Sequence, residues 1–409
     1  MRIHFILAAN NSSSQTRVTV EYANRLVRRG HTIIVSVPRF DFFDFVCWKL
    51  RRDSQQRVDA LRRTNRFLHW LVIPYMRALL ICRPWFAKTG HKLDPRVRIH
   101  RYLAVPTEGN MPDADVVVAL QCYLLGHLAL LTPRKGKVVS SIRLDYQAGT
   151  AEPAQEIASW REFCVSFYRR FPVPLFAVSR RAKESANGLG IPVGVVIPNG
   201  VNTEEFTDSG RRGNPQPLRV TLFVQDHPQK GQDFGCALIR RLRELPLNGK
   251  VLYCTVGNGV KPEHRALFDF HYGYLTGEDY PRMYRQTDIL VFPSQYEGFP
   301  AIPLEAMASG CAVATTLVSG VDEYALHEQN CMVCSPVDID GMVHNVRRLI
   351  SDVRLRDTLR DNGVATARRY TWEKATDRLE AFLKGLPAEE TKEDPWTQPL
   401  LPSTLQPHN

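Results

Sequence analysis

The chain alternates short apolar runs with stretches in which apolar residues recur at helical spacing. In the first such unit, Ile3 to Ala8 has the pattern of a buried strand, Ser12 to Ser14 that of a loop and helix cap, and Thr16 to Arg29 that of a helix ended by Gly30. Further strands are predicted at Thr32 to Val37, Val116 to Leu120, Val138 to Ile142, Leu175 to Val178 and Val193 to Ile197. This alternation is typical of βαβ units, so the first half of the chain predicts a doubly wound parallel sheet.

A second series of the same kind follows a connection rich in Gly, Pro and Asn at residues 199–217. Its predicted strands are Arg219 to Val224, Val251 to Val256, Ile289 to Pro293 and Ala312 to Thr315. Its predicted helices are Asp233 to Leu245, Asp279 to Gln286, Pro303 to Ser309 and Gly341 to Ser351. The sequence therefore predicts a second α/β domain of similar design.

The length of 409 residues also favours two domains. We place the first at residues 1–198 and the second at 218–370, with a disordered tail at 387–409 that is dense in Pro, Glu and Thr. Two Rossmann-like domains face each other across a cleft, and ligands of such sheets bind outside the carboxyl ends of the strands. The chemistry is therefore expected in that cleft.

Positive charge is concentrated near the start of the chain. Residues 1–100 carry 19 Lys and Arg against 6 Asp and Glu, whereas the rest of the chain is almost neutral. Within this region, residues 40–101 interleave arginines with aromatic and aliphatic residues and form a basic, apolar insertion. This pattern suits an interfacial helix on anionic lipid, or a helical insertion that packs on its own domain. No nucleic-acid recognition module is visible, so nucleic acid is not an expected partner.

Neither export nor metal binding is indicated. The first residues lack a signal-peptide core, and the run from Leu68 to Cys82 is shorter than the ~20 residues that span a bilayer. Nine cysteines without regular spacing fit a reducing cytosol, and the single CxxC of Cys331 and Cys334 has no partner motif. We expect a cytoplasmic protein, peripheral on the inner face of the membrane if the insertion binds lipid, with no metal or cofactor.

The most informative stretch is SQYEGFPAIPLEAMASG at Ser294 to Gly310, which follows a predicted strand and opens a helix. Glu297 is placed in the turn and Glu305 in the first turn of the helix. A helix N-terminus adds roughly half a positive charge and free amides that bind phosphate. Those amides are assigned to the following four residues: Gly298, Phe299, Ala301 and Ile302. Carboxylates that accept from sugar hydroxyls, together with amides that bind a diphosphate, suit a sugar nucleotide. In the alternative interpretation, Glu305 only complements the helix dipole and Glu297 is a solvated loop residue.

Part of this stretch, EGFPAIPLEAMASG, resembles the E-x7-E motif of retaining family 4 glycosyltransferases of the GT-B fold. PNGVNTEEF at Pro198 to Phe206 and FAVSRRAKESANGLGI before it resemble the segments that close the first domain in that family. PDADVVVA at Pro112 to Ala119 and KGKVVSSIRLDYQAG at Lys135 to Gly149 are similar to a subset that includes bacterial rhamnosyltransferases of polysaccharide assembly. The resemblance covers residues 110–385.

The resemblance implies roles for particular residues. Glu305 would bind the ribose of the donor nucleotide, Glu297 would lie beside the transferred sugar, and Lys230 would contact the donor phosphates. The backbone at Tyr274 and Leu275 would face the base. A terminal helix at residues 371–386 would cross back to the first domain. A lysine suits the negative charge that develops as a nucleoside diphosphate departs.

The chain departs from the family pattern in three places. Val224 and Gln225 stand where the family usually has an arginine for the phosphates, with Arg282 or Arg285 as substitute candidates. AANNSSSQ replaces a glycine loop, so Ser12 serves either the donor or the helix cap. Arg143 stands where the family often has a histidine, and Arg143 or Asp145 contacts either acceptor or sugar, or they form a surface pair.

We therefore predict a retaining, metal-independent glycosyltransferase that moves a sugar from a nucleotide diphosphate sugar to a glycan or lipid-linked acceptor of the bacterial surface. Within the fold, an epimerase or phosphorylase is the rival. Outside it, the rivals are a nucleotide-binding protein that has lost catalysis and a basic protein that binds membrane or nucleic acid.

Overall fold

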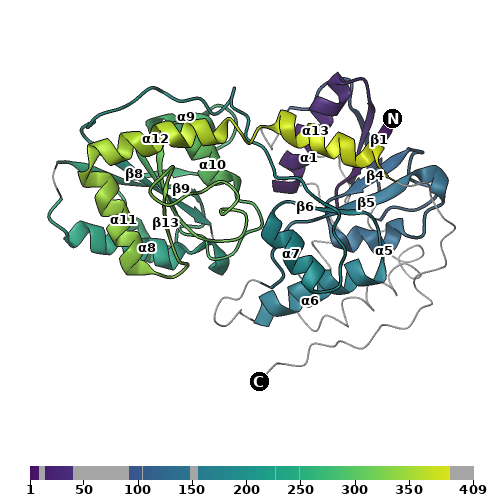
Figure 1. The fold of residues 1–409 in the computed structure, drawn as a ribbon, viewed down its shortest axis with the longest axis horizontal. Helices are drawn as coiled ribbons and strands as arrows, with labels where there is room; N and C mark the ends of the chain where they lie inside the picture. The colour runs from purple at the N-terminus through teal and green to yellow at the C-terminus, as the bar shows by residue number, and fades with distance from the viewer. Residues whose placement is uncertain are drawn as a thin grey trace.

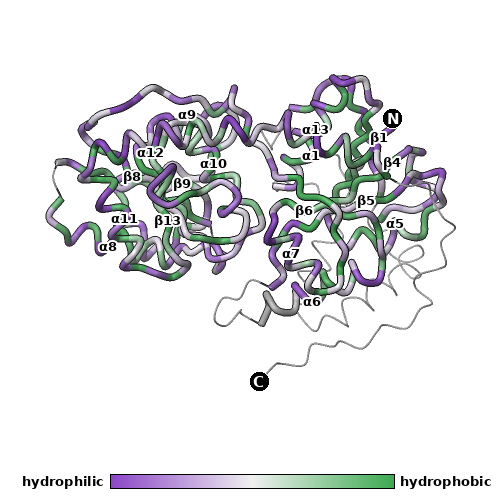
Figure 2. The backbone as a smooth tube through the Cα atoms, in the orientation of Figure 1, coloured by the Kyte–Doolittle hydropathy of each residue, from purple (hydrophilic) through white to green (hydrophobic). Residues whose placement is uncertain are grey.

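The computed structural model describes residues 1–8, 14–39, 92–103, 105–147, 155–225, 227–247 and 249–386. These residues form two parallel sheets, each covered by helices, in two domains that lie side by side (Figure 1). The α/β class predicted from the alternating pattern is thus confirmed. Hydrophobic residues concentrate along the strands inside each domain (Figure 2).

The first domain contains a seven-stranded sheet in the order β3-β2-β1-β4-β5-β6-β7. Its strands are β1 (Arg2–Ile6), β2 (Thr32–Pro38), β3 (Arg98–Tyr102), β4 (Val116–Ala119), β5 (Lys137–Ile142), β6 (Leu175–Ala177) and β7 (Val195–Val196). Its helices are α1 (Ser14–Arg28), α5 (Leu125–Leu128), α6 (Gln155–Arg170) and α7 (Arg180–Gly188), with short 3-10 turns η1 (Cys122–Leu124) and η2 (Pro133–Lys135). The strand order reverses between β1 and β4, which opens a crevice at their carboxyl ends.

The second domain contains a six-stranded sheet in the order β10-β9-β8-β11-β12-β13. Its strands are β8 (Leu218–Gln225), β9 (Val251–Asn258), β10 (Phe270–Gly273), β11 (Ile289–Phe292), β12 (Ala312–Thr316) and β13 (Met332–Cys334). Its helices are α8 (Gln232–Glu244), α9 (Asp279–Gln286), α10 (Ala301–Ala308), α11 (Ile339–Ser351) and α12 (Val353–Ala367), with 3-10 turns η3 (Pro228–Lys230) and η4 (Pro262–Leu267). Here the order reverses between β8 and β11.

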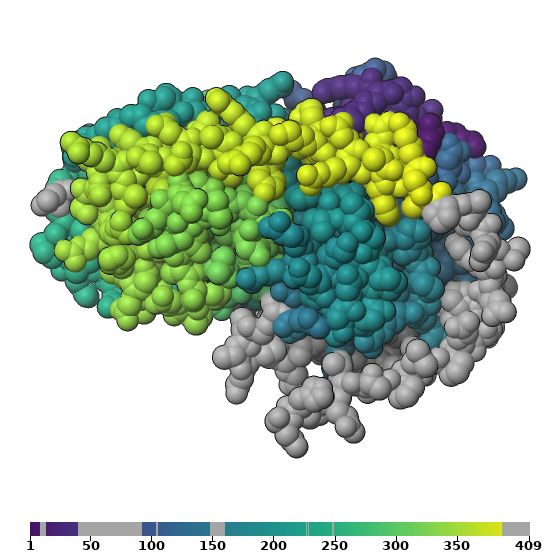
Figure 3. Space-filling view, viewed as in Figure 1, coloured from purple at the N-terminus to yellow at the C-terminus, as the bar shows by residue number. Residues whose placement is uncertain are grey.

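The last helix, α13 (Trp372–Lys384), leaves the second domain and packs on the first. Trp372, Leu379 and Leu383 are buried in a core shared with α1 and the first sheet. Burying a side chain of this size stabilises a fold by about 1.5 to 3 kcal/mol. The C-terminal helices thus form a continuous band over both domains (Figure 3).

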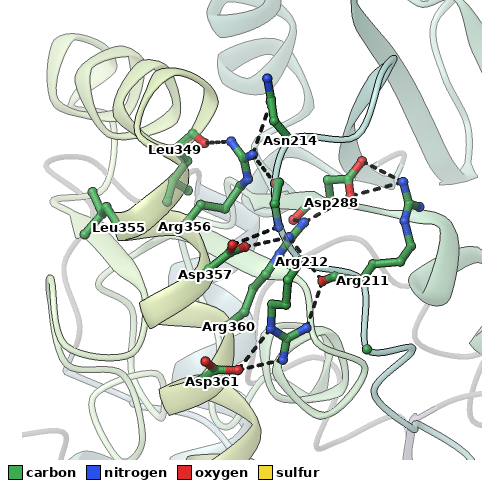
Figure 4. A network of polar contacts seen from close by, with 12 residues as sticks. Arg211, Arg212, Asn214, Asp288, Leu349, Leu355, Arg356, Asp357, Arg360 and Asp361 are labelled. Atoms are coloured by element: carbon green, nitrogen blue, oxygen red, sulfur yellow. Dashed lines mark hydrogen bonds and ion pairs between the residues drawn. The ribbon is translucent and has the colours of Figure 1, made fainter.

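The connection between the domains is tied to the second domain by buried arginines (Figure 4). Arg360 donates to Asp288 at 3.0 Å, and Arg356 donates to the carbonyl of Gly213 at 2.7 Å. Both arginines and Asp288 are almost fully buried. This network anchors the connection beside β11, whose end carries the predicted motif.

Two details differ from the sequence-based expectations, and two other expectations fall outside the described residues. Residues 98–101 of the predicted insertion lie in β3, which pairs in register with β2. The sequence pattern did not indicate this strand, because an edge strand tolerates charged side chains that hide the hydrophobic alternation. The lipid-binding hypothesis falls mainly on residues 40–91, which lie outside the described residues, as does the predicted tail. Helix α10 begins at Ala301, two residues before the predicted start, because Pro300 is extended and ends the preceding turn. In the described part of the chain, no helix is long and apolar enough to cross a membrane.

Candidate active-site cleft

A cavity of about 650 Å³ lies between the two domains. Its first wall comes from α1 and from the segments that follow β4 and β5. Its second wall comes from the ends of β8 and β9, from the turn after β11 and from the start of α10. Both points of strand reversal therefore face this cavity, as the doubly wound pattern predicts.

The turn after β11 brings the two domains into contact. A Cβ atom added to Gly298 would lie 1.6 Å from the carbonyl oxygen of Arg143, so only glycine fits between the domains here. Helix α10 starts directly after this turn, and Pro300 at its N-cap provides no side-chain cap. The first amides of a helix lack partners within the helix, so Ala301 and Ile302 present donors to the cavity that they line.

Glu297 in this turn forms an ion pair with Lys230. Lys230 Nζ lies 2.6 Å from Glu297 Oε1, and Ser294 Oγ donates to the same oxygen at 2.8 Å. The two loops are joined by their backbones, since the Gln295 amide donates to the Gln229 carbonyl at 2.7 Å. The carboxylate and the ammonium group thus form one unit at the carboxyl ends of β8 and β11.

Glu305 is 1% exposed and both of its carboxylate oxygens accept hydrogen bonds. Arg17 Nη1, from α1 of the first domain, lies 2.5 Å from Oε1, while Tyr280 and Tyr284 donate to Oε2 at 2.9 and 3.0 Å. Glu305 lies in the second turn of α10 and not in the first turn, as predicted, because the helix begins at Ala301. Its role as a mere partner of the helix dipole does not fit this specific burial.

Burial controls the protonation of the groups around Glu305. Burial and the nearby carboxylate raise the pKa of Tyr280 and Tyr284 well above the ordinary value, so both remain hydrogen-bond donors. Burial lowers the pKa of Arg17, but Glu305 and the other acidic groups around it together outweigh this effect and raise that pKa overall. Glu205, which also lines the cavity, has its pKa raised by burial despite the opposing charge of Arg17.

Arg143 and Asp145 follow β5, yet only Arg143 lines the cavity. Burial lowers the pKa of the Arg143 guanidinium. Asp145 is buried behind the wall, where its carbonyl accepts from the Tyr296 hydroxyl at 2.6 Å and its carboxylate accepts from the Gln147 amide at 3.0 Å. The structure therefore separates the two side chains and places Asp145 away from the cavity lining.

The other predicted residues divide clearly. Phe299, Tyr274, Leu275 and Gln225 line the cavity, and Tyr274 is 58% exposed. Val224 points into the core of the second domain. Neither substitute arginine lines the cavity, and Arg282 instead pairs with Asp279 at 3.1 Å. Ser12 lies outside the described residues.

Sequence reasoning missed four residues of the site, namely Arg17, Tyr280, Tyr284 and Ser294. Tyr280 and Tyr284 are spaced i, i+4 on α9, which places both hydroxyls on one helix face. That spacing was a usable signal. Arg17 carried none, because its partner Glu305 lies 288 positions further along the chain.

Metal-binding groups are not found at this site or elsewhere among the described residues, where no three His, Cys, Asp or Glu side chains converge. Cys331 of the CxxC pair is buried, and Cys334 is partly buried.

Comparison with known proteins shows a partial sequence match. Residues 268–366 match the family model described as glycosyl transferases group 1. An uncharacterized glycosyltransferase of Methanocaldococcus jannaschii is 32% identical over 202 residues, which cover 44% of this chain and 50% of that protein. The O-antigen chain mannosyltransferase B of Escherichia coli is 32% identical over 104 residues, covering 25% and 27% of the two chains. The chain spans about half the length of the first of these relatives, and less of the second.

Comparison of structures extends over most of the chain. HepE from Anabaena, in complex with UDP and glucose, aligns over 94% of this chain and 100% of its own, with a TM-score of 0.66 at 15% identity. Sucrose-phosphate synthase from Thermosynechococcus elongatus aligns over 94% and 98%, with a TM-score of 0.66 at 15% identity. The chain therefore has the GT-B fold, and its second domain contains a region of the glycosyl transferases group 1 type.

Proposed function

We propose that this protein is a retaining glycosyltransferase, of the family 4 type, that moves a sugar from a nucleotide diphosphate sugar to a glycan or lipid-linked acceptor. The observation that carries the proposal is the meeting of Glu297, Glu305 and Lys230 with the N-terminus of α10 in one interdomain cavity. Carboxylates for hydroxyls and donors for phosphates are what a sugar nucleotide requires.

In this proposal, the ribose hydroxyls bind Glu305, and the diphosphate binds Lys230 and the amides of Ala301 and Ile302. The segment at Tyr274 and Leu275 lies on the same cavity wall and provides the surface for the base. The glucose and UDP in the HepE complex support a donor of this class. The ribose hydroxyls must displace Arg17 from Glu305, because Arg17 already forms an ion pair with this carboxylate.

The transfer itself follows from this placement. The acceptor hydroxyl attacks the anomeric carbon on the face from which the diphosphate leaves, so the configuration is retained. The bond to the phosphate oxygen breaks, the bond to the acceptor oxygen forms, and the hydroxyl proton passes to the leaving diphosphate. Lys230 and the helix N-terminus stabilise the developing charge, so we expect transfer to continue in the presence of EDTA.

The acceptor belongs, in our proposal, to bacterial surface polysaccharide biosynthesis. The similarity to an O-antigen chain mannosyltransferase, which covers a quarter of this chain, supports this role. The basic, apolar residues 40–91 would hold the protein on the cytoplasmic face of the membrane, where a lipid-linked acceptor is expected.

A binding screen tests the donor site. The purified protein is titrated calorimetrically with UDP, GDP, dTDP and ADP and with their common sugars, alongside Glu305→Ala and the exposed control Glu263→Ala. We expect one diphosphate to stabilise the wild type and the control, because a ligand at 100 times its Kd adds about 2.7 kcal/mol of stability. Binding that is absent from the wild type, or equal in Glu305→Ala, would overturn the donor site. Binding without any transfer would favour a protein that has lost catalysis.

A further inference from the structure

The cavity contains one cation whose charge no group of the described residues balances. Three cationic side chains line it, and two of them have carboxylate partners, since Arg17 pairs with Glu305 at 2.5 Å and Lys230 with Glu297 at 2.6 Å. Arg143 has neither an ion pair nor a side-chain hydrogen bond to any of the described residues. Its Nη1 atom is buried from solvent and unpartnered.

The immediate surroundings of Arg143 do not supply negative charge either. The ionisable groups that act on its guanidinium are the phenols of Tyr22, Tyr168 and Tyr146. Burial raises the pKa of all three phenols, so they are neutral at physiological pH. Arg143 as a whole is partly exposed, but its Nη1 atom is buried, and none of the described groups replaces the hydration that this atom has lost.

Arg143 lies on the cavity wall at a point where the two domains meet. Its carbonyl abuts Gly298, directly beside Glu297, and the turn leads into the N-terminus of α10. The opposite wall therefore carries amides suited to an anion, while the wall of the first domain carries a free guanidinium. Guanidinium groups bind carboxylates and phosphates through paired hydrogen bonds.

We propose that Arg143 binds an oxyanion of the substrate, and that this oxyanion completes the charge balance of the cavity. The inference rests on the proposed function in that the substrate is a sugar nucleotide. Two sources provide the same chemistry: the donor diphosphate, or a carboxylate carried by the transferred sugar. Arg143 is thereby a substrate-binding residue that decides whether an anionic group is accepted.

Binding measurements separate these sources. Wild type, Arg143→Met, Arg143→Lys and the exposed control Arg134→Met are titrated with inorganic pyrophosphate, UDP, GDP, UDP-glucose and UDP-glucuronate. We expect Arg143→Met to lose at least tenfold in affinity and Arg143→Lys to recover part of the loss. An equal loss for pyrophosphate, the nucleotides and both sugars identifies the diphosphate. A loss confined to UDP-glucuronate identifies the sugar carboxylate. Equal affinities of wild type and Arg143→Met for every probe would overturn the proposal.

The stability of the ligand-free protein provides an independent readout. Because Arg143 has no anionic partner in the part of the chain that the structure describes, Arg143→Met should leave the melting temperature unchanged or raise it. A decrease of several degrees in both Arg143→Met and Arg143→Lys would show a structural role and contradict the inference. Pyrophosphate binding that depends on Arg143, in a protein that binds no nucleotide, would refute the proposed function while supporting the oxyanion site. Absence of binding by all probes would refute both.

Discussion

The two carboxylates of the cleft form ion pairs with cationic side chains of the protein itself. Glu297 contacts Lys230, and Glu305 contacts Arg17 and two tyrosines. These contacts hold both carboxylates in a fixed orientation without a ligand. A sugar nucleotide must replace such contacts with its own, so its binding energy includes the cost of separating them. The specificity of the site therefore depends on the exchange of hydrogen-bond partners.

Removal of the Lys230 charge should mainly slow the chemical step. In the proposed reaction, Lys230→Met removes a cation from the leaving diphosphate, and loss of one such group costs about 100-fold or more in kcat. The exposed control Lys250→Met should retain full activity. Steady-state kinetics with the donor found in the binding screen provide the measurement. A variant with unchanged kcat would show that Lys230 is a structural partner of Glu297 alone.

At the scale of elements, the sequence pattern predicted the central strands and the edge strand β7, but it missed the other edge strands, β3, β10 and β13. Strands such as β4 and β11 are apolar at every position, whereas the edge strands β3 and β10 are largely exposed and contain charged or polar residues. An edge strand buries little surface, so hydrophobicity does not reveal it. Helix α12 was not assigned for a different reason: the face that it buries includes two arginines, Arg356 and Arg360, which obscure its apolar pattern.

The Arg360–Asp288 pair belongs to the network that fixes the interdomain connection, and its disruption should destabilise the second domain. Asp288 accepts from Arg360 at 3.0 Å and from the Arg219 amide at 2.9 Å, in a site without solvent contact. Asp288→Ala breaks this buried ion pair and leaves Arg360 with Asp357, at 3.1 Å, as its remaining carboxylate partner, which should cost up to about 3 to 5 kcal/mol. The exposed pair of Asp340 and Arg241 serves as the control, since Asp340→Ala should cost less than about 1 kcal/mol. Urea unfolding of both variants tests this difference, and equal midpoints would contradict it.

The docking of α13 should depend on acidity through Glu380. Hydrogen bonds from Lys384, Arg29 and His31 lower the pKa of its carboxyl group from 4.5 to about 2. A group whose pKa falls on folding stabilises the fold above its unfolded pKa and loses that contribution as it becomes protonated. The contribution is therefore present above about pH 4.5 and disappears toward pH 2. Because the ion pairs are partly open to solvent, we expect it to be about 1 kcal/mol.

The variant Glu380→Gln isolates this contribution. Its melting temperature should lie below that of the wild type at pH 6, and the two should converge as the pH falls toward 2. Parallel curves over this range would show that Glu380 does not link docking of α13 to acidity.

For the whole molecule, the cleft is a product of contacts that no local pattern encodes. Arg17 meets Glu305, the Tyr296 hydroxyl donates to the Asp145 carbonyl, and Arg181 pairs with Asp322 at 2.7 Å, each across the two domains. The motif around Glu297 and Glu305 was visible from sequence because strand, turn and helix are consecutive. The residues that face it from the first domain were not, because their positions depend on how two separately folded sheets meet. Arg143 was singled out only by its position in the family pattern. The sequence did not reveal that its guanidinium has no anionic partner among the described residues.

The contact between the domains at Gly298 should control activity without controlling folding. A methyl group at Gly298 would lie 1.6 Å from the Arg143 carbonyl, and no side-chain adjustment relieves a clash with backbone. Gly298→Ala should force the domains apart and lower transfer by at least tenfold, because misplacement of reacting groups by about 1 Å costs up to 100-fold. Each sheet remains intact, so the unfolding midpoint should change little. The control Gly194→Ala, whose added Cβ atom has its nearest neighbour at 3.8 Å, should keep its activity. Solution scattering would detect the opening as a larger radius of gyration in Gly298→Ala. Full activity with unchanged scattering would show that the protein turns over without bringing Gly298 against Arg143.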